Sequence, residues 1–276
     1  MHNPFRITLF LLLIASVTIN CARTRAVSST FTPTPITIDG SITDWPRDRM
    51  QIENNPEYDM YFANDEDFLY LYVIVKSTQI HSDIEEFGLN LYFDTDNRFR
   101  RSFGVIYPIG ILNGISNIPG ARQEYLQNPG WANISENQQI IASLKNEMPN
   151  RVMLVQRSSS RDAIRPIPVN MEALRAQDLH LKMDEESRLL NIEMKVPIRS
   201  TRARQFAIDV EDGKPIYVGF EVQPPSLDEI LGEDQNINSR DSQTAGTRRQ
   251  QNASQFARMQ LRGEFSRWVK VELAKP

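Results

Sequence analysis

The sequence predicts an all-β fold, an antiparallel β-sandwich of the jelly-roll kind with little helix. Apolar segments of six to nine residues alternate with clusters of Asp, Asn, Gly and Pro along most of the chain, a spacing that is typical of short strands joined by turns. Helical periodicity is almost absent. Ten or so such strands suit two packed antiparallel sheets in one domain, and 40% hydrophobic with 24% charged residues is a globular composition.

The amino terminus predicts export. Arg6 precedes an apolar stretch of 13 residues, Ile7 to Ile19. A membrane-spanning helix needs roughly 20 apolar residues, so this stretch suits a signal peptide better. Cys21, the one cysteine of the chain, follows directly and resembles the acylated cysteine of a bacterial lipoprotein, although Asn20 stands where a small residue is usual. An ordinary secretory signal with an incidental cysteine is the alternative.

The residues after Cys21 predict a tether. Residues 22–35 are rich in Ser, Thr and Pro without a period, which favours an extended linker that lifts the domain off the membrane. No Asp follows the cysteine, and by resemblance to enterobacterial sorting rules this favours the outer membrane. The predicted division is therefore a lipoprotein signal peptide at 1–21, a linker at 22–35 and a sandwich domain at 36–276, located in the bacterial cell envelope.

The clearest strand is Phe68–Val75, which is apolar on both faces and is therefore expected at the centre of a sheet. Phe87–Asp94 comes next, with Phe87, Leu89, Leu91 and Phe93 on one face. Further strands are expected at residues 103–107, 151–156, 179–183, 189–196, 205–210, 216–222 and 265–273.

Helix is expected to be scarce. Met171–Ala176 has the composition of one or two helical turns, and Ser226–Leu231 that of a capped turn. Residues 232–251 contain very few apolar side chains, which predicts a disordered excursion over 232–262, with a short helix at 253–261 before the last strand.

Composition excludes several functions. The net charge is -4, from 31 Lys and Arg against 35 Asp and Glu, which argues against nucleic acid as a partner. One cysteine excludes an intramolecular disulfide, a Cys-rich zinc site and an iron–sulfur cluster. Three histidines form no recognisable zinc or Ser-His-Asp pattern. The sequence therefore predicts no enzyme.

Three segments in order carry a resemblance: Ile36–Pro46 with Ile-Asp-Gly and a following Trp, Asn64–Val73 with its Leu-Tyr strand, and Leu89–Asn97 with Asp-Thr-Asp. Together they resemble family 9 carbohydrate-binding modules and their DOMON-like β-sandwich relatives. The motifs cover residues 34–110. The number of predicted strands extends the resemblance to residue 222, or to residue 273 if the last strand is included. The resemblance implies a polysaccharide or oligosaccharide partner bound without catalysis.

The motif residues also have structural explanations. Asp39-Gly40 is a turn dipeptide, and Trp45 is expected to plug one end of the sandwich rather than contact sugar. Asp94, Asp96 and Asn97 place three oxygen ligands within four residues. Calcium takes six to eight oxygens, and the resembled family often carries Ca²⁺, so we predict a calcium site here. A solvated turn is the alternative.

Sugar binding needs flat rings and a few fixed polar groups. Trp131 lies in Tyr125–Asn133, a segment rich in Pro, Gly and Asn, so its ring is expected at the surface. Trp268 alternates with charged residues and is expected on a solvated face or under the 232–262 excursion. The candidate carbohydrate-binding residues are Trp131, Tyr125, Asn128 and Trp268. Ordinary packing is the alternative for both tryptophans, and no Trp pair stands in local sequence that matches the family's clamp.

Two functional hypotheses follow. The first is a non-catalytic carbohydrate-binding lipoprotein within a polysaccharide-utilisation or degradation system. The second is an envelope scaffold that has lost sugar binding and contacts a partner protein. An exposed ring pair near Trp131 would favour the first hypothesis. A buried Trp131 with an apolar patch elsewhere would favour the second.

Overall fold

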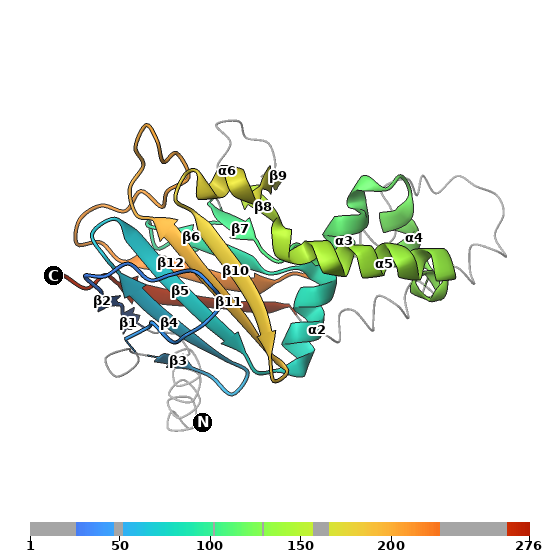
Figure 1. The fold of residues 1–276 in the computed structure, drawn as a ribbon, viewed down its shortest axis with the longest axis horizontal. Helices are drawn as coiled ribbons and strands as arrows, with labels where there is room; N and C mark the ends of the chain where they lie inside the picture. The colour runs from blue at the N-terminus through green and yellow to red at the C-terminus, as the bar shows by residue number, and fades with distance from the viewer. Residues whose placement is uncertain (1–25, 47–51, 102, 129, 157–165, 227–263) are drawn as a thin grey trace, which may run out of the picture.

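Two sheets lie face to face in the computed structural model (Figure 1), which describes residues 26–46, 52–101, 103–128, 130–156, 166–226 and 264–276. The sheets are largely antiparallel, so the predicted sandwich is confirmed. The seven-stranded sheet has the order β1 (Ala26–Ser28), β13 (Phe265–Glu272), β12 (Ile216–Val222), β6 (Asn90–Asp94), β7 (Gly104–Ile106), β8 (Arg151–Val155) and β9 (Ile167–Asn170). The six-stranded sheet has the order β10 (His180–Glu186), β11 (Leu189–Pro197), β5 (Phe68–Val75), β4 (Tyr58–Asn64) and β2 (Thr30–Phe31), with β3 (Ile52–Asn54) also paired to β4.

Strand β5 is central, as its apolar sequence predicts. Leu69, Leu71 and Val73 are fully buried in the core between the sheets. The opposite face of β5 contributes Tyr70 and Tyr72 to a second buried cluster on the outside of the six-stranded sheet. Both faces of the strand are thus covered, which explains why it has no polar alternation.

The loop at residues 32–46 covers that outer face. Trp45 is 4% exposed, and its ring meets the edge of Tyr72 at 5.6 Å between centroids. Its indole N–H donates to Oε1 of the fully buried Glu193 at 2.8 Å, while the amides of Asp39 and Gly40 donate to Oε2 at 2.9 and 2.8 Å. Gly40 has φ 91°, the positive value that a glycine turn allows. The predicted packing role of Trp45 is confirmed, although Trp45 closes a sheet face rather than an end.

The predicted linker is wrong for residues 26–31, because residues 26–28 and 30–31 form the strands β1 and β2. β1 pairs in parallel with β13, and β2 pairs in parallel with β4, so the segment passes from one sheet to the other. Val27 is buried in the core, and Ser29, also buried, accepts the amide of Ala274 at 3.0 Å. The Ser, Thr and Pro residues of this segment are typical of a linker, so its composition did not indicate the strand pairing. Residues 1–25, with the predicted signal peptide and Cys21, lie outside the described residues.

Helices occupy more of the chain than the prediction allowed. α2 (Thr78–Phe87) begins at Ser77, whose side chain accepts the amide of Ile80, and ends at Gly88 with φ 89°. Its buried Ile80, Ile84 and Phe87 follow helical spacing, so the predicted strand at 87–94 loses its first residues. α3 (Gly110–Gly114), α4 (Ala121–Gln127) and α5 (Ser135–Glu147) form a helical lobe, residues 110–150, between β7 and β8 (Figure 1).

The expected short helix at 171–176 is confirmed as α6 (Met171–Arg175), whereas residues 205–210 form no strand. The predicted excursion at 232–262 lies outside the described residues. Among the residues that are described, no helix is long and apolar enough to cross a membrane.

Candidate functional site

The outer face of the seven-stranded sheet carries a row in which glycines alternate with aromatic residues. Trp268, Gly219, Tyr92 and Gly104 are register neighbours on β13, β12, β6 and β7. A Cβ atom on Gly219 would lie 2.7 Å from the Trp268 ring, and one on Gly104 would lie 3.0 Å from Cδ1 of Tyr92. The Trp268 ring therefore lies over Gly219, where a side chain would collide with it. At Gly104 a Cβ atom would first meet the backbone oxygen of Leu91, at 2.1 Å.

Two further rings adjoin this row, and we call the set of Trp268, Tyr92, Phe99 and Tyr217 the Trp268 platform. The Trp268 and Tyr92 rings are within 9° of parallel, with centroids 6.4 Å apart. Phe99 lies 5.4 Å from Trp268 between centroids, with the two ring planes inclined by 56°, and 5.8 Å from Tyr217, with the planes at 86°. Phe99 is 41% exposed and Trp268 is half-buried, while the two tyrosines are buried. Trp268 and Phe99 are thus the accessible rings, and the tyrosines support them.

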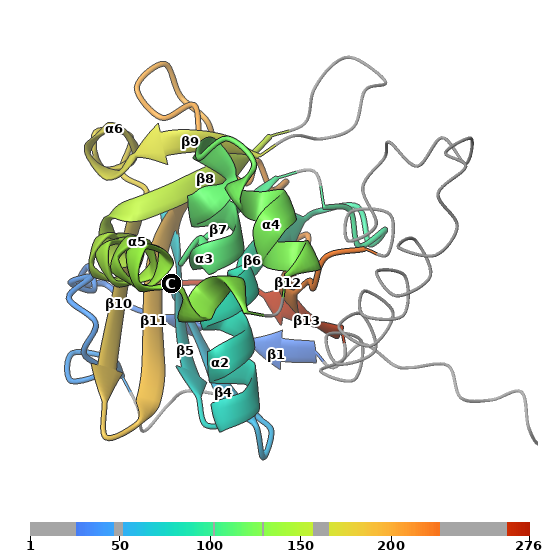
Figure 2. The same ribbon diagram turned by 90° about the vertical axis from the view of Figure 1, so that its right-hand side faces the viewer.

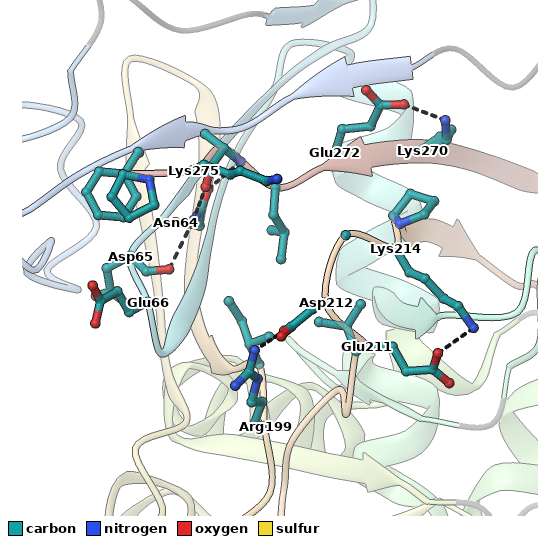
Figure 3. A pocket seen from close by; sticks show the side chains of 18 residues that line it. Asn64, Asp65, Glu66, Arg199, Glu211, Asp212, Lys214, Lys270, Glu272 and Lys275 are labelled. Carbon is teal, nitrogen blue, oxygen red and sulfur yellow. Dashed lines mark hydrogen bonds and ion pairs between the residues drawn. The ribbon is translucent and has the colours of Figure 1, made fainter.

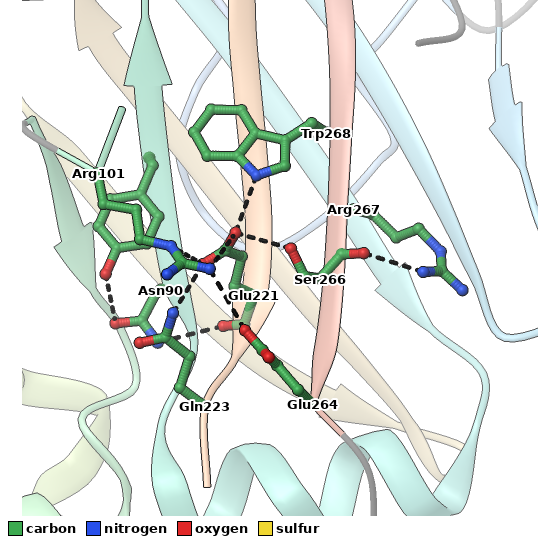
Figure 4. A network of polar contacts seen from close by, with 9 residues as sticks. Asn90, Arg101, Glu221, Gln223, Glu264, Ser266, Arg267 and Trp268 are labelled. Carbon is green, nitrogen blue, oxygen red and sulfur yellow. Dashed lines mark hydrogen bonds and ion pairs between the residues drawn. The ribbon is translucent and has the colours of Figure 1, made fainter. Parts of the chain in front are cut away.

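A buried carboxylate fixes the Trp268 ring (Figure 4). Oε1 of Glu221, a fully buried residue on β12, accepts the indole N–H of Trp268 at 2.8 Å and the hydroxyl of Ser266 at 2.7 Å. Nε of Arg101 lies 2.7 Å from Oε2, which also accepts the Gln223 amide at 2.9 Å. The guanidinium compensates the buried charge. The indole edge is therefore locked in one orientation before any ligand arrives.

Burial also affects the neighbouring tyrosine. Desolvation, assisted by the negative charge of Glu221, raises the pKa of Tyr92 to about 12. Its hydroxyl therefore stays protonated at neutral pH and donates to Oδ1 of Asn90 at 3.3 Å.

The predicted metal residues instead shape the loop that carries Phe99 and Arg101. Oδ2 of Asp94 accepts the amides of Arg98 and Arg100 at 2.8 and 3.2 Å, and its Oδ1 accepts the amide of Asp96 at 3.2 Å. These bonds close the turn after β6. The turn returns the chain over the sheet, so Phe99 reaches Trp268.

The same bonds do not fit a calcium site in this conformation. The oxygens of Asp94 already accept three amides, and Asp96 pairs with Arg100 at 3.0 Å. Asn97, with φ 56°, lies in the same turn. Within the described ranges, no group of three or more His, Cys, Asp or Glu could hold a metal ion. Calcium binding stays a prediction.

The structure corrects the expected exposure of Trp131. Its ring is 3% exposed and meets the edge of Tyr125 at 5.6 Å between centroids. The indole N–H donates to Oε2 of Glu124 at 3.1 Å. The Pro, Gly and Asn residues that suggested a surface loop join two helices that were not predicted. The helical lobe encloses the ring, so its faces are not available to a sugar.

The other two candidates of that segment have structural partners as well. The hydroxyl of Tyr125 donates to Glu86 on α2 at 3.0 Å, and Oδ1 of Asn128 accepts the amide of Gly130 at 3.0 Å. Trp131, Tyr125 and Asn128 are thus brought together in the helical lobe. Trp268 stands apart from them, on β13 of the seven-stranded sheet.

Sequence reasoning missed the partners of Trp268. Tyr92 and Glu221 lie within segments predicted as strands, and their sequence positions do not distinguish them from solvent-facing strand residues. Arg101 follows a turn. The available signal was glycine inside two strands, Gly104 and Gly219, since a strand glycine often marks a close approach.

A cavity of about 940 Å³ opens at one end of the sandwich, beside the turn between β4 and β5 (Figure 3). Phe31 is the one aromatic residue among its lining residues. Charged side chains on its rim pair with one another, Lys214 with Glu211 at 2.7 Å and Lys270 with Glu272 at 2.5 Å. This cavity offers fewer flat rings to a sugar than the Trp268 platform does.

No protein-family model and no curated protein matches the sequence. Two solved structures of a family 9 carbohydrate-binding module from Caldicellulosiruptor kristjanssonii are similar. The complex with glucose has 9% identity and a TM-score of 0.34, covering 91% of this chain and 97% of the other. The complex with cellotriose has 9% identity and a TM-score of 0.32, covering 72% and 76%.

Proposed function

We propose that this protein is a non-catalytic carbohydrate-binding lipoprotein of the bacterial envelope and that it binds an oligosaccharide or polysaccharide on the Trp268 platform. One observation carries the proposal. The Trp268 ring lies flat on Gly219, its N–H is fixed by the buried Glu221, and the exposed Phe99 lies beside it. Such a ring can take the C–H face of a pyranose.

The rigidity of the ring supports binding. Ordering a free side chain during association costs roughly 0.5–1.5 kcal/mol, and the hydrogen bond to Glu221 removes that cost for Trp268. Polar groups lie at the edge of the ring for contact with sugar hydroxyls. They are the Ser266 hydroxyl and the guanidinium of Arg101, whose side chain is 46% exposed.

The cellular setting is part of the same proposal. The apolar stretch before Cys21 supports export, and acylation of Cys21 would attach the chain to the outer membrane, where bound glycan would serve a polysaccharide-degrading system. The protein's role there is to hold glycan, and cleavage would belong to a separate enzyme.

A glycan array followed by calorimetry on the detergent-solubilised full chain tests the proposal. Trp268→Ala should weaken binding at least about tenfold, which corresponds to ~1.4 kcal/mol. The matched control is Trp131→Phe, which changes the enclosed tryptophan and should leave affinity unchanged. Circular dichroism verifies that both variants are folded. If a folded Trp268→Ala chain keeps full affinity, the platform is not the site.

The second candidate is an envelope scaffold that contacts a partner protein. The enclosure of Trp131 favours it, together with Ile118 and Ile134 of the helical lobe, which are 36% and 43% exposed. A folded full chain that binds no glycan, together with envelope crosslinks that map to the lobe, would support this candidate over glycan binding.

A further inference from the structure

Phe99 combines two features that are unfavourable for a large apolar residue. Its φ is 51°, in the left-handed region where a bulky side chain crowds the backbone. Six residues other than glycine have a positive φ within the described ranges, and Phe99 is the one apolar residue among them. The other five are Asn97, Asp178, Ser187, Arg188 and Asp209. The Phe99 ring is also 41% exposed. A backbone outlier of this kind points to a functional role.

The turn after β6 imposes this backbone conformation. The buried side chain of Asp94 accepts the amides of Arg98 and Arg100, one residue on each side of Phe99, at 2.8 and 3.2 Å. Both hydrogen bonds go to the same oxygen, Oδ2, so the two flanking amides are drawn together and the backbone of Phe99 is held between them. Asp94 is therefore a positioning residue for the Phe99 ring.

The Phe99 ring stands at an angle beside the Trp268 ring. The strands β6, β12 and β13 are neighbours (Figure 2), so the turn after β6 lies near Tyr217 on β12 and Trp268 on β13. The Phe99 and Trp268 planes are inclined by 56°, with centroids 5.4 Å apart. A pyranose between two rings needs two carbon contacts of about 3.5–4 Å each, roughly 7–8 Å in total. A sugar can therefore stack only on the open face of Trp268, with Phe99 along one side.

We propose that Phe99 is a specificity-determining residue, a side wall that restricts the Trp268 platform to glycans that are unbranched at the sugar stacked on Trp268. This proposal rests on the proposed binding of glycan at the platform. A branch on the side of the sugar that faces Phe99 collides with the ring, whereas an unsubstituted edge gains C–H contacts with it. The stability lost at a strained and exposed residue is thus compensated by selectivity.

Two variants separate the backbone strain from the ring contacts. Phe99→Gly and Phe99→Val both remove the ring, but glycine adopts a positive φ freely, whereas a β-branched residue does not. The melting temperature of Phe99→Gly should therefore be higher than that of Phe99→Val by about 2–4 °C. Equal melting temperatures would contradict the strained conformation and overturn the proposal.

A glycan array followed by calorimetry on the full chain measures the selectivity. Two reference pairs share a backbone: cellohexaose with xyloglucan oligosaccharides, and mannohexaose with galactomannan oligosaccharides. For the backbone that binds, the parent chain should prefer the linear member at least about tenfold. Phe99→Gly should reduce this preference several-fold, and Phe99→Tyr, which keeps the ring, should retain it. Asp94→Asn replaces one accepting oxygen with an NH₂ group, so it should also reduce the preference.

The outcomes distinguish this proposal from the proposed function. Trp268→Ala should lose binding of the linear and the branched glycans alike, which places the measured binding on the platform. A parent chain without preference, or a folded Phe99→Gly chain that keeps the full preference, overturns the role of Phe99 and leaves glycan binding intact. A folded parent chain that binds no glycan on the array overturns the proposed function, and the role of Phe99 with it.

Discussion

The two sheets each bury a glutamate on the outer face, and each glutamate accepts a tryptophan N–H at 2.8 Å. Glu193 on β11 meets Trp45, and Glu221 on β12 meets Trp268. The other donors differ. From the part of the chain that the structure describes, Glu193 also receives the neutral amides of Asp39 and Gly40, and burial raises its pKa to about 7. Glu221 receives the cation of Arg101.

The two glutamates differ in what they stabilise: Glu193 holds a loop against its sheet, whereas Glu221 orients a ring that stays partly exposed. Trp45 is enclosed, because its loop covers the sheet and Glu193 on that sheet accepts hydrogen bonds from the loop. Trp268 keeps part of its ring accessible, because Glu221 holds only the indole edge and the ring lies on a glycine. The same pair of residue types therefore serves stability in one sheet and, on our proposal, recognition in the other.

The largest expected effect is the loss of the enclosed ring. Trp45→Ala should lower the free energy of unfolding by ~3–5 kcal/mol, since it empties a buried site and removes one donor from Glu193. Trp268→Ala should cost clearly less, because that ring is half-buried. Urea denaturation followed by circular dichroism measures both. Equal losses would show that the two rings have the same structural role.

Glu193 should make stability depend on pH. Its folded pKa is raised from 4.5 to about 7, so the folded state binds the proton more tightly than the unfolded state does. This contribution is fully present below about pH 4.5 and is lost as pH rises through 7. The loss should be up to roughly 3 kcal/mol.

The variant Glu193→Gln isolates that effect in urea denaturation at several pH values between 4.5 and 8. It should flatten the profile in this window, because the titrating group is gone. A parent chain whose stability rises across the window would contradict the assignment.

A smaller effect is expected from removing the cation beside Glu221. Arg101→Ala should cost about 2 kcal/mol, because the buried carboxylate loses a charged donor, and should weaken glycan binding by freeing Trp268. The matched control is Arg100→Ala. Arg100 pairs with Asp96, whose side chain is 51% exposed, and such surface ion pairs contribute ~1 kcal/mol or less to stability. Thermal denaturation compares the stability of the two variants. Equal losses of stability would mean that the cation of Arg101 does not stabilise the buried Glu221.

The smallest expected effect tests the glycine beneath the ring. Gly219→Ala places a methyl group 2.7–2.9 Å from three carbons of Trp268, so the ring must tilt. The free energy of unfolding should fall by about 1 kcal/mol, and the affinity for glycan should also fall. Gly130→Ala, where the nearest atom is 3.4 Å away, should change neither quantity. Unchanged affinity in Gly219→Ala would show that ring orientation is unimportant.

Patterns that depend on local chemistry were predictable. The alternation in Ile216–Val222 and the apolar run at Phe68–Val75 predicted strands that the structure contains. The buried position of Trp45, an apolar residue next to Pro46, was also predictable. The helical lobe was not, because α5 buries only Leu144 among its side chains and so lacks a strong apolar stripe. Its helices depend on contacts with one another, which a local pattern does not record.

The sequence by itself determined that two apolar-faced sheets would pack, because strand alternation leaves one face of each sheet to bury. It also supplied the candidate Trp268. Only the tertiary structure decided which tryptophan is accessible. Trp131 is enclosed by helices, whereas Trp268 lies on a strand beside Gly219. Residues 92, 104, 219, 221 and 268 come from four strands, and strand register, a long-range property, places them in one site.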